Sequence, residues 1–143
     1  MAALLALDVG DKRVGLAMAA EGSFVASPYL TIPRAGGRAE REIVALISQH
    51  KIEQLIVGLP LGEGGEKNEQ CLKVESFCRR IQKRVQIEIQ FVDEYVSSYE
   101  AEEKLRLAGT SGKHLKRDGL LDAASAAIIL QSYIDAELSR GKP

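Results

Sequence analysis

The segment LALDVGDKRVG, residues 5–15, carries the strongest indication of the fold. Its apolar first half is typical of a strand that is buried on both faces. The apolar run is broken at Asp8, and Gly10, Lys12 and Arg13 follow before the chain becomes apolar again. A buried carboxylate without a partner is costly, so Asp8 requires a backbone donor, a cation or a metal ion. An aspartate that stabilises a turn is the simpler alternative.

Apolar stretches on both sides of this segment predict an antiparallel meander. Strands are expected over residues 3–9, 13–20 and 23–32. Glu21 and Gly22 suit a tight turn between the second and the third strand. Gly10 lets the backbone turn closely beside Asp8, which favours a short connection between the first two strands.

The rest of the chain alternates between helical and strand patterns. In chain order we expect a helix at 38–50, a strand at 54–60, a helix at about 66–84, a strand at 85–92, a helix at about 97–108, a basic Gly-rich loop at 109–119 and a helix at about 119–139. Strands separated by helices pair in parallel through right-handed crossovers. The sequence therefore predicts an α/β protein with a mixed five-stranded sheet flanked by helices, in a single domain spanning 1–143.

Composition excludes several classes of protein. The chain has 143 residues, 45% of them hydrophobic and 27% charged, with a net charge of -1. This balance gives no sign of a nucleic-acid binder, so such a site has to come from local charge. Cys71 and Cys78 are too few for a disulfide framework and suit helix packing. No apolar run approaches the roughly 18 residues of a spanning helix. We expect a cytoplasmic protein with no membrane segment.

Acidic residues stand at the predicted ends of two other elements. Asp93 and Glu94 follow the strand at 85–92, and the carboxyl ends of parallel strands form the ligand crevice of open α/β sheets. Alternation puts Asp93 on the apolar side of that strand and Glu94 on the wetter side, without deciding which of them points inward. Asp122 lies one turn inside the last helix, for which Asp118 is a natural N-cap. It shares the stripe that should pack on the sheet, with Ala126, Ile129, Leu130 and Tyr133.

Three acids from distant segments can thus meet at one edge of the sheet. Two like charges ~5 Å apart cost roughly 3 kcal/mol at an effective dielectric of 20. A hard divalent cation such as Mg²⁺ reverses that sign and binds carboxylate and phosphate oxygens. Two such ions about 4 Å apart would stabilise the attacking and leaving oxygens in phosphodiester cleavage. Loop acids at 93–94 and a helix-dipole role for Asp122 are the simpler alternatives.

Four motifs in order along the chain resemble one known family. DVGDKRVGLAM, IVGLP, FVDE and LLDAASAAIILQSY are similar to the motifs of the YqgF family, also called RuvX, whose members are Holliday-junction-resolvase-like proteins. The resemblance implies an RNase H-like fold with strand order 3-2-1-4-5 and strand 2 antiparallel. It implies that Asp8, Glu94 and Asp122 are the catalytic residues and the ligands of Mg²⁺ or Mn²⁺. It also implies cleavage of structured nucleic acid, in 5′-end maturation of pre-16S ribosomal RNA or in resolution of Holliday junctions.

One position departs from the family pattern. The family has arginine after the acidic pair and then two threonines, whereas this chain reads DEYVSS. The serines keep hydroxyl groups, but Tyr95 cannot supply a cation to a phosphate. The departure bears on rate, substrate preference and activity. The sequence leaves open whether the substrate is RNA or branched DNA, and whether the protein is a monomer or a homodimer.

Local clusters of cations supply candidate phosphate contacts. The candidates for nucleic-acid binding are Lys12, Arg13, Lys113, Lys116 and Arg117. Further cations at Arg34, Arg38 and Arg41 have no face assigned by the sequence. Solvated surface charge is the simpler interpretation of any one of these residues.

Two other functions fit parts of the sequence. An aspartate and glycine at a strand hairpin also resemble the phosphate loop of actin-like and sugar-kinase ATPases, which need two such domains, where this chain supplies one. A scaffold that binds ribosomal RNA without cleaving it is the second alternative, suggested by Tyr95.

Overall fold

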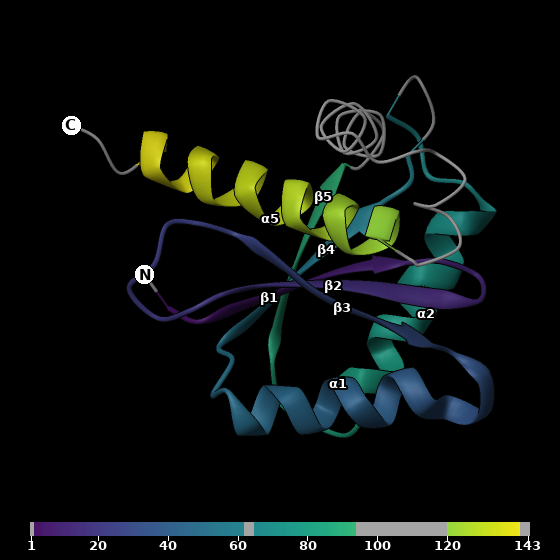
Figure 1. The fold of residues 1–143 in the computed structure, drawn as a ribbon. Helices are drawn as coiled ribbons and strands as arrows, with labels where there is room; N and C mark the ends of the chain where they lie inside the picture. The colour runs from purple at the N-terminus through teal and green to yellow at the C-terminus, as the bar shows by residue number, and fades with distance from the viewer. Residues whose placement is uncertain (1, 62–64, 94–119, 141–143) are drawn as a thin grey trace.

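The fold is a five-stranded sheet with helices on both faces, in a computed structural model that describes residues 2–61, 65–93 and 120–140 (Figure 1). The strands are β1 (Leu4–Val9), β2 (Arg13–Ala19), β3 (Ser27–Pro33), β4 (Gln54–Leu59) and β5 (Glu88–Asp93). The helices are η1 (Ala35–Gly37), α1 (Arg38–Gln49), α2 (Glu69–Gln82) and α5 (Leu120–Arg140). The helix expected at 97–108 and the basic loop at 109–119 lie outside the described residues.

The sheet is mixed and its order is β3-β2-β1-β4-β5. β1 pairs antiparallel with β2, and β2 pairs antiparallel with β3. On its other side β1 pairs parallel with β4, and β4 pairs parallel with β5. This topology confirms the predicted meander, the two parallel additions and the order 3-2-1-4-5. Because β1, β4 and β5 are parallel, their carboxyl ends lie at the same edge of the sheet.

Three elements begin three or more residues later than the sequence pattern predicts. β3 begins at Ser27 rather than at 23, because the Gln131 side chain bonds the backbone of Ala26 and Phe24 and holds that segment on α5. α2 begins at Glu69 because the side chain of Asn68 accepts a hydrogen bond from the Cys71 N–H and caps the helix. β5 begins at Glu88 rather than at 85, because the chain is still turning out of α2 before it enters the sheet.

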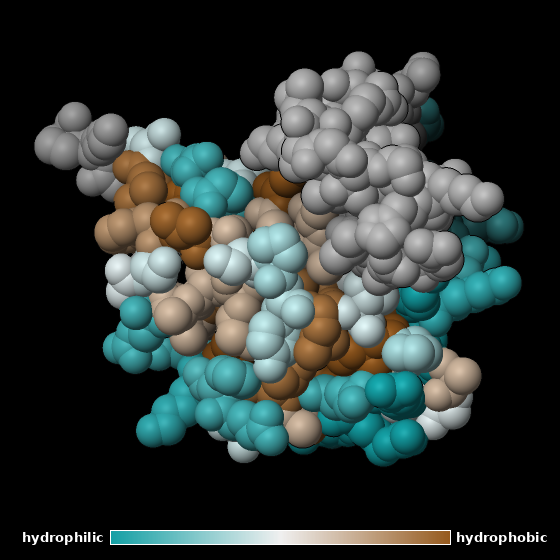
Figure 2. All heavy atoms as spheres, in the orientation of Figure 1, coloured by the Kyte–Doolittle hydropathy of each residue, from teal (hydrophilic) through white to brown (hydrophobic). Residues whose placement is uncertain are grey.

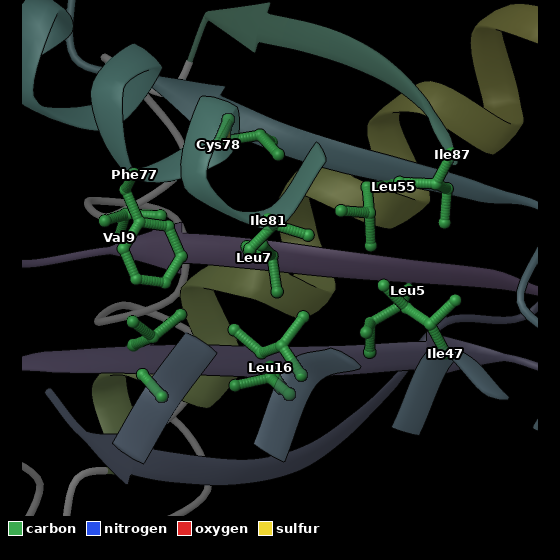
Figure 3. Packing of buried hydrophobic residues seen from close by; sticks show 14 of the residues in the cluster. Leu5, Leu7, Val9, Leu16, Ile47, Leu55, Phe77, Cys78, Ile81 and Ile87 are labelled. Atoms are coloured by element: carbon green, nitrogen blue, oxygen red, sulfur yellow. The ribbon is translucent and has the colours of Figure 1, made fainter. Parts of the chain in front are cut away.

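The larger core lies between the sheet and helices α1 and α2. Figure 3 shows β1 and α2 contributing to it, with Leu5, Leu7 and Val9 from the strand and Phe77, Cys78 and Ile81 from the helix. The predicted apolar stripe of α2 is buried as expected. Each large apolar side chain buried in this way contributes about 1.5–3 kcal/mol.

A smaller core lies on the opposite face of the sheet, under α5. It contains Leu4 and Ala6 of β1, Ala17 and Ala19 of β2, Ile56 of β4, and Ala126, Ile129, Leu130 and Ile134 of α5. In Figure 1 α5 runs along this face, while α1 and α2 cover the other. Every second residue of β1 therefore faces α5, and this alternation fixes the direction of the residues at the end of the strand.

β3 forms one edge of the sheet, and the surface over it is partly apolar. Figure 2 shows tan and brown side chains between α5 and α1, where β3 lies. Tyr29 and Leu30 on this strand are exposed. The edge also carries Pro28 and Pro33, which lack an N–H and limit pairing with another strand. None of the helices in the described residues could span a membrane.

Candidate active site

Asp8 lies on the α5 face of the sheet, at the carboxyl end of β1. Leu5, Leu7 and Val9 pack toward α1 and α2, whereas Leu4 and Ala6 pack toward α5. Asp8 has the parity of the second group. It is partly buried and stands directly opposite Gly15 of β2 in the antiparallel register. The side chain is thus directed to the space where α5 begins.

The first turn of α5 lies directly on Gly15. A Cβ added at Gly15 would overlap the carbonyl oxygen of Asp122 and would lie 2.8 Å from the nitrogen of Ala123. No residue with a side chain can occupy that position unless the helix moves. Because Gly15 is the register partner of Asp8, this contact brings Asp122 and Asp8 to the same corner of the fold. The small residues of DAASAA permit this approach.

Asp122 is paired with Arg13, the first residue of β2. The Nε of Arg13 lies 3.2 Å from Oδ2 of Asp122, and the side chains are 46% and 30% exposed. Burial raises the pKa of Asp122 above its ordinary value, and the attraction and hydrogen bond of Arg13 offset the rise only in part. The charged form of Asp122 is therefore less stable in this environment than it would be in water, which is a common property of functional acids.

Asp93 lies on the other face of the sheet. It is the register partner of Leu59, which belongs to the core under α1 and α2, and it is exposed. Val92, one residue earlier, packs against the core under α5. Asp93 is therefore not on the face that carries Asp8 and Asp122. Glu94 lies outside the described residues.

The loop between β1 and β2 is held in place from β3. The N–H of Gly10 donates to the carbonyl of Arg13 at 2.8 Å, and a Cβ at Gly10 would lie 2.9 Å from that oxygen. Arg34 donates from Nη1 to the carbonyl of Gly10 at 2.8 Å and from its backbone N–H to the carbonyl of Lys12 at 2.9 Å. The close turn at Gly10 agrees with the sequence prediction, and the structure shows in addition that hydrogen bonds from Arg34 hold the loop in place.

The donor set suits a hard divalent cation in part. Asp8 and Asp122 supply carboxylate oxygens, which Mg²⁺ and Mn²⁺ prefer. Within the described residues no group of three His, Cys, Asp or Glu side chains is close enough to hold a metal ion. The third predicted acid, Glu94, is outside those residues, as are Tyr95, Lys113, Lys116 and Arg117.

The sequence patterns assign no role to two residues of this region. Gly15 lies inside the leading motif, and a glycine inside a strand pattern signals close approach of another backbone. Arg34 is one of three cations whose position on the fold the sequence leaves open. Its contacts with Gly10 and Lys12 join residues that are distant along the chain, and no short-range pattern reveals them.

Comparison with protein families and relatives gives a consistent result. A family model described as RuvX, Holliday junction resolvase, matches residues 2–136. A protein of Syntrophus aciditrophicus, named as a candidate pre-16S rRNA nuclease, is 37% identical over 93% of this chain and 88% of its own length. A protein of the same name from Gloeothece citriformis is 38% identical over 96% of this chain and 90% of its own.

Comparison with solved structures supports the fold. Thermus thermophilus RuvC in complex with a Holliday junction substrate superposes with a TM-score of 0.61 and 16% identity, covering 100% of this chain and 99% of RuvC. A structure of the same protein described without a substrate gives a TM-score of 0.58, also at 16% identity and covering 99% of both chains. The similarity confirms the predicted RNase H-like architecture.

Proposed function

Because the chain belongs to the family of RuvX Holliday junction resolvases, we propose that it is a metal-dependent nuclease that trims the 5′ end of pre-16S ribosomal RNA. Membership of this family confirms the assignment that the sequence motifs suggested. With it comes the prediction of an enzyme that acts on phosphodiester bonds.

The convergence of Asp8 and Asp122 is the observation that carries the proposal. The two acids come from opposite ends of the chain and meet across Gly15, at the edge where the parallel strands end. Burial of the Asp122 carboxylate is unfavourable, and the ion pair with Arg13 offsets this cost only in part. Functional acids are often held in such an environment, and a bound cation shared by Asp122 and Asp8 would stabilise the charged carboxylates.

We assign Asp8, Glu94 and Asp122 as the ligands of Mg²⁺ or Mn²⁺. Glu94 has the same parity along the chain as Val92, which faces α5, whereas Asp93 belongs to the opposite parity. This parity argument favours Glu94 over Asp93, in agreement with the family motif. Bound divalent cations would supply an activated water and stabilise the leaving oxygen at the scissile phosphate.

The residues of the chain itself position the substrate. Asp8 is held by a central strand and Asp122 by a helix packed on the sheet, so both carboxylates are rigidly placed. Arg13 has guanidinium donors that can reach a phosphate oxygen as well as Asp122. Lys113, Lys116 and Arg117 are proposed as further contacts to the nucleic-acid backbone.

We propose ribosomal RNA as the substrate because several relatives are described as candidate pre-16S rRNA nucleases. Such a role would place the protein in the cytoplasm. Paired cuts in a four-way DNA junction are the alternative, and they would require two active sites and therefore a homodimer. A single trimming cut can be made by a monomer.

A cleavage assay with two substrates tests this function. Purified protein is incubated with Mg²⁺ or Mn²⁺ and either a 5′-extended 16S precursor RNA or a four-way DNA junction. We expect wild type to cleave the RNA, while Asp8→Asn binds the RNA and does not cleave it. Cleavage of the junction alone would reassign the substrate. Binding without cleavage of either substrate would contradict the nuclease and favour the scaffold, and Tyr95→Arg would then be the first variant to make.

Metal binding has a test that needs no substrate. Mn²⁺ should raise the melting temperature of wild type, because a ligand that binds the folded state stabilises it by mass action. The shift should be lost in Asp8→Asn and in Glu94→Gln, and kept in Asp93→Asn, which alters the neighbouring acid of the opposite parity. Equal shifts in wild type and Asp8→Asn would remove Asp8 from the ligand set.

A further inference from the structure

A second cationic site lies on the far side of the β1–β2 loop from Asp122. It is an open hollow of about 640 Å³ between that loop, the end of β3 and helix α2. Its lining residues are Asp11, Lys12, Arg34, Ala35 and Lys73. Three cations face one carboxylate there, so the hollow has an excess of positive charge in a chain whose net charge is -1.

Arg34 is held rigidly at the base of this hollow. Its Nη1 donates to the carbonyl of Gly10 at 2.8 Å, and its guanidinium carbon lies 5.0 Å from the centre of the Phe77 ring. A guanidinium has five N–H donors, and one hydrogen bond and one ring contact leave others available to an oxygen ligand. Because the side chain is already ordered, little conformational entropy is lost when a ligand binds.

Lys73 enters the hollow from α2. Its Nζ lies 4.0 Å from Oδ1 of Asp11, which also accepts a hydrogen bond of 3.3 Å from Gln70. The Lys73 and Asp11 side chains are 60% and 67% exposed, so this long ion pair is weak. A phosphate, with more charge and more acceptor oxygens, would compete well for Lys73.

Lys12 and Arg13 connect the hollow to the active site. They are adjacent in the chain, yet Arg13 reaches Asp122 on the α5 face and Lys12 lines the hollow on the α2 face. A nucleic-acid strand that crosses the tip of the β1–β2 loop would therefore meet cations on both faces. The loop itself is fixed by Arg34, which contacts the carbonyls of Gly10 and Lys12.

We propose that Lys12, Arg34 and Lys73 form a binding site for a backbone phosphate of the substrate, separate from the phosphate that is cleaved. This proposal rests on the proposed function in so far as the ligand is a nucleic acid. The hollow anchors the strand on the α2 face and so sets which phosphate reaches Asp8 and Asp122. Asp11 weakens the site by its charge and is not a ligand.

The directions in which two substitutions change nucleic-acid binding distinguish a phosphate site from a purely structural role. If Lys73 and Asp11 only stabilise each other, then replacing either residue should change nucleic-acid affinity by the same small amount and in the same direction. If the hollow binds a phosphate, Lys73→Gln should weaken binding, whereas Asp11→Asn should strengthen it by removing a repulsive charge. Lys83→Gln is the matched control, because Lys83 is an exposed lysine at the other end of α2, about 15 Å along the axis.

Fluorescence anisotropy with a labelled 5′-extended 16S precursor RNA and a labelled four-way junction, in chelator and over 50–200 mM salt, measures these effects. At about 0.1 M salt we expect Lys73→Gln to bind about five- to tenfold more weakly. We also expect the slope of log K against log salt to fall by about 0.7 to 0.9, the loss of one phosphate contact. Lys83→Gln should keep both the wild-type affinity and slope, and Asp11→Asn should bind at least twofold more tightly.

A Lys73→Gln variant that behaves like Lys83→Gln, or that shifts in the same direction as Asp11→Asn, would overturn the phosphate site. Cleavage that depends on Asp8 would then still support the nuclease. Conversely, the expected binding pattern without any cleavage by wild type would support the phosphate site and contradict the nuclease. Wild type that binds neither nucleic acid would overturn both.

Discussion

Gly15 of β2 and Asp122 of α5 touch through their backbones, and this contact is what assembles the candidate site. The position of a Cβ at Gly15 is already filled by the carbonyl of Asp122. The helix can therefore lie flat on the strand, with Asp122 beside the register partner of Gly15, which is Asp8. Two acids 114 positions apart (122 − 8) are thereby joined through one residue that has no side chain.

Gly15→Ala should displace the first turn of α5. The obstructing atoms belong to the backbone, so a side-chain rotation cannot relieve the clash. We expect the free energy of unfolding to fall by about 3 kcal/mol, as for severe overpacking, and the Mn²⁺-induced rise in melting temperature to disappear. Urea denaturation and a thermal melt with Mn²⁺ measure the two effects.

Gly22→Asn is the control for this substitution. Gly22 has a φ of +81° in a turn with open space around its Cβ position, and asparagine tolerates that backbone conformation better than most residues. Its stability should change by less than about 1 kcal/mol, and its response to Mn²⁺ should match wild type. If Gly15→Ala behaved like this control, the close contact would not be what positions Asp122.

Asp122→Asn should stabilise the protein in the absence of a divalent cation. Burial raises the pKa of Asp122, and Arg13 offsets this only in part, so the ionised carboxyl opposes folding. The contribution of the protonated Asp122 to stability is fully present below the unfolded pKa of 3.8. It is lost as the pH rises through the folded pKa, which is higher. In chelator at pH 7 the variant should therefore melt above wild type, and the difference should shrink as the pH falls toward 3.8.

Asp135→Asn, on an exposed position of the same helix, serves as its control and should show no such pH-dependent gain. A lower melting temperature for Asp122→Asn at pH 7 would mean that the pairing with Arg13 outweighs the burial of the carboxylate.

Local sequence patterns predicted most of the sheet, because the strands have distinct apolar or alternating runs and glycine or proline follows β1 and β4. They did not predict where β3 begins, since that depends on Gln131, which lies 105 residues from Ala26. They also did not predict that Arg13 pairs with Asp122, because the two residues are 109 positions apart (122 − 13) and meet only when α5 packs on the sheet.

The side of the sheet on which each acid lies also depends on contacts between distant elements, which local patterns do not contain. The sequence placed Asp93 and Glu94 on opposite sides of a strand, and the contact of Val92 with the core under α5 shows which side faces that helix. That information comes from packing between distant elements. The sequence did not show which face Arg34 lies on, for the same reason. Its partners Gly10 and Phe77 are far from it along the chain.

A partly buried ion pair joins α1 and α2, on the face of the sheet opposite α5, and gives a third prediction. Oε2 of Glu40 on α1 accepts from Nε of Arg80 on α2 at 3.1 Å, while Oε1 is buried with no hydrogen-bond partner among the described residues. Arg80→Met should destabilise the fold by about 1–2 kcal/mol, because Glu40 then keeps a buried charge without its partner. The figure is modest since Arg80 is 44% exposed.

The double variant Glu40→Met/Arg80→Met should recover most of that loss, because a buried pair is often no more stabilising than apolar side chains of similar size. Urea denaturation of both single variants and the double variant gives the coupling between the two positions. Additive losses in the double variant would show that the pair does not act as a unit.

The thiol of Cys78 should be inert at neutral pH and should weaken the fold at high pH. Burial, followed by the charge of Glu75, raises its pKa from 9.0 to about 12. The folded state then keeps the proton while the unfolded chain releases it, so stability falls between pH 9 and about 12, by at most about 1.4 kcal/mol for each pH unit. Cys78→Ala removes this dependence at the cost of a small cavity. The difference in unfolding free energy between wild type and Cys78→Ala should therefore narrow steadily above pH 9, and parallel curves would show that Cys78 ionises in the folded protein as readily as in the unfolded chain.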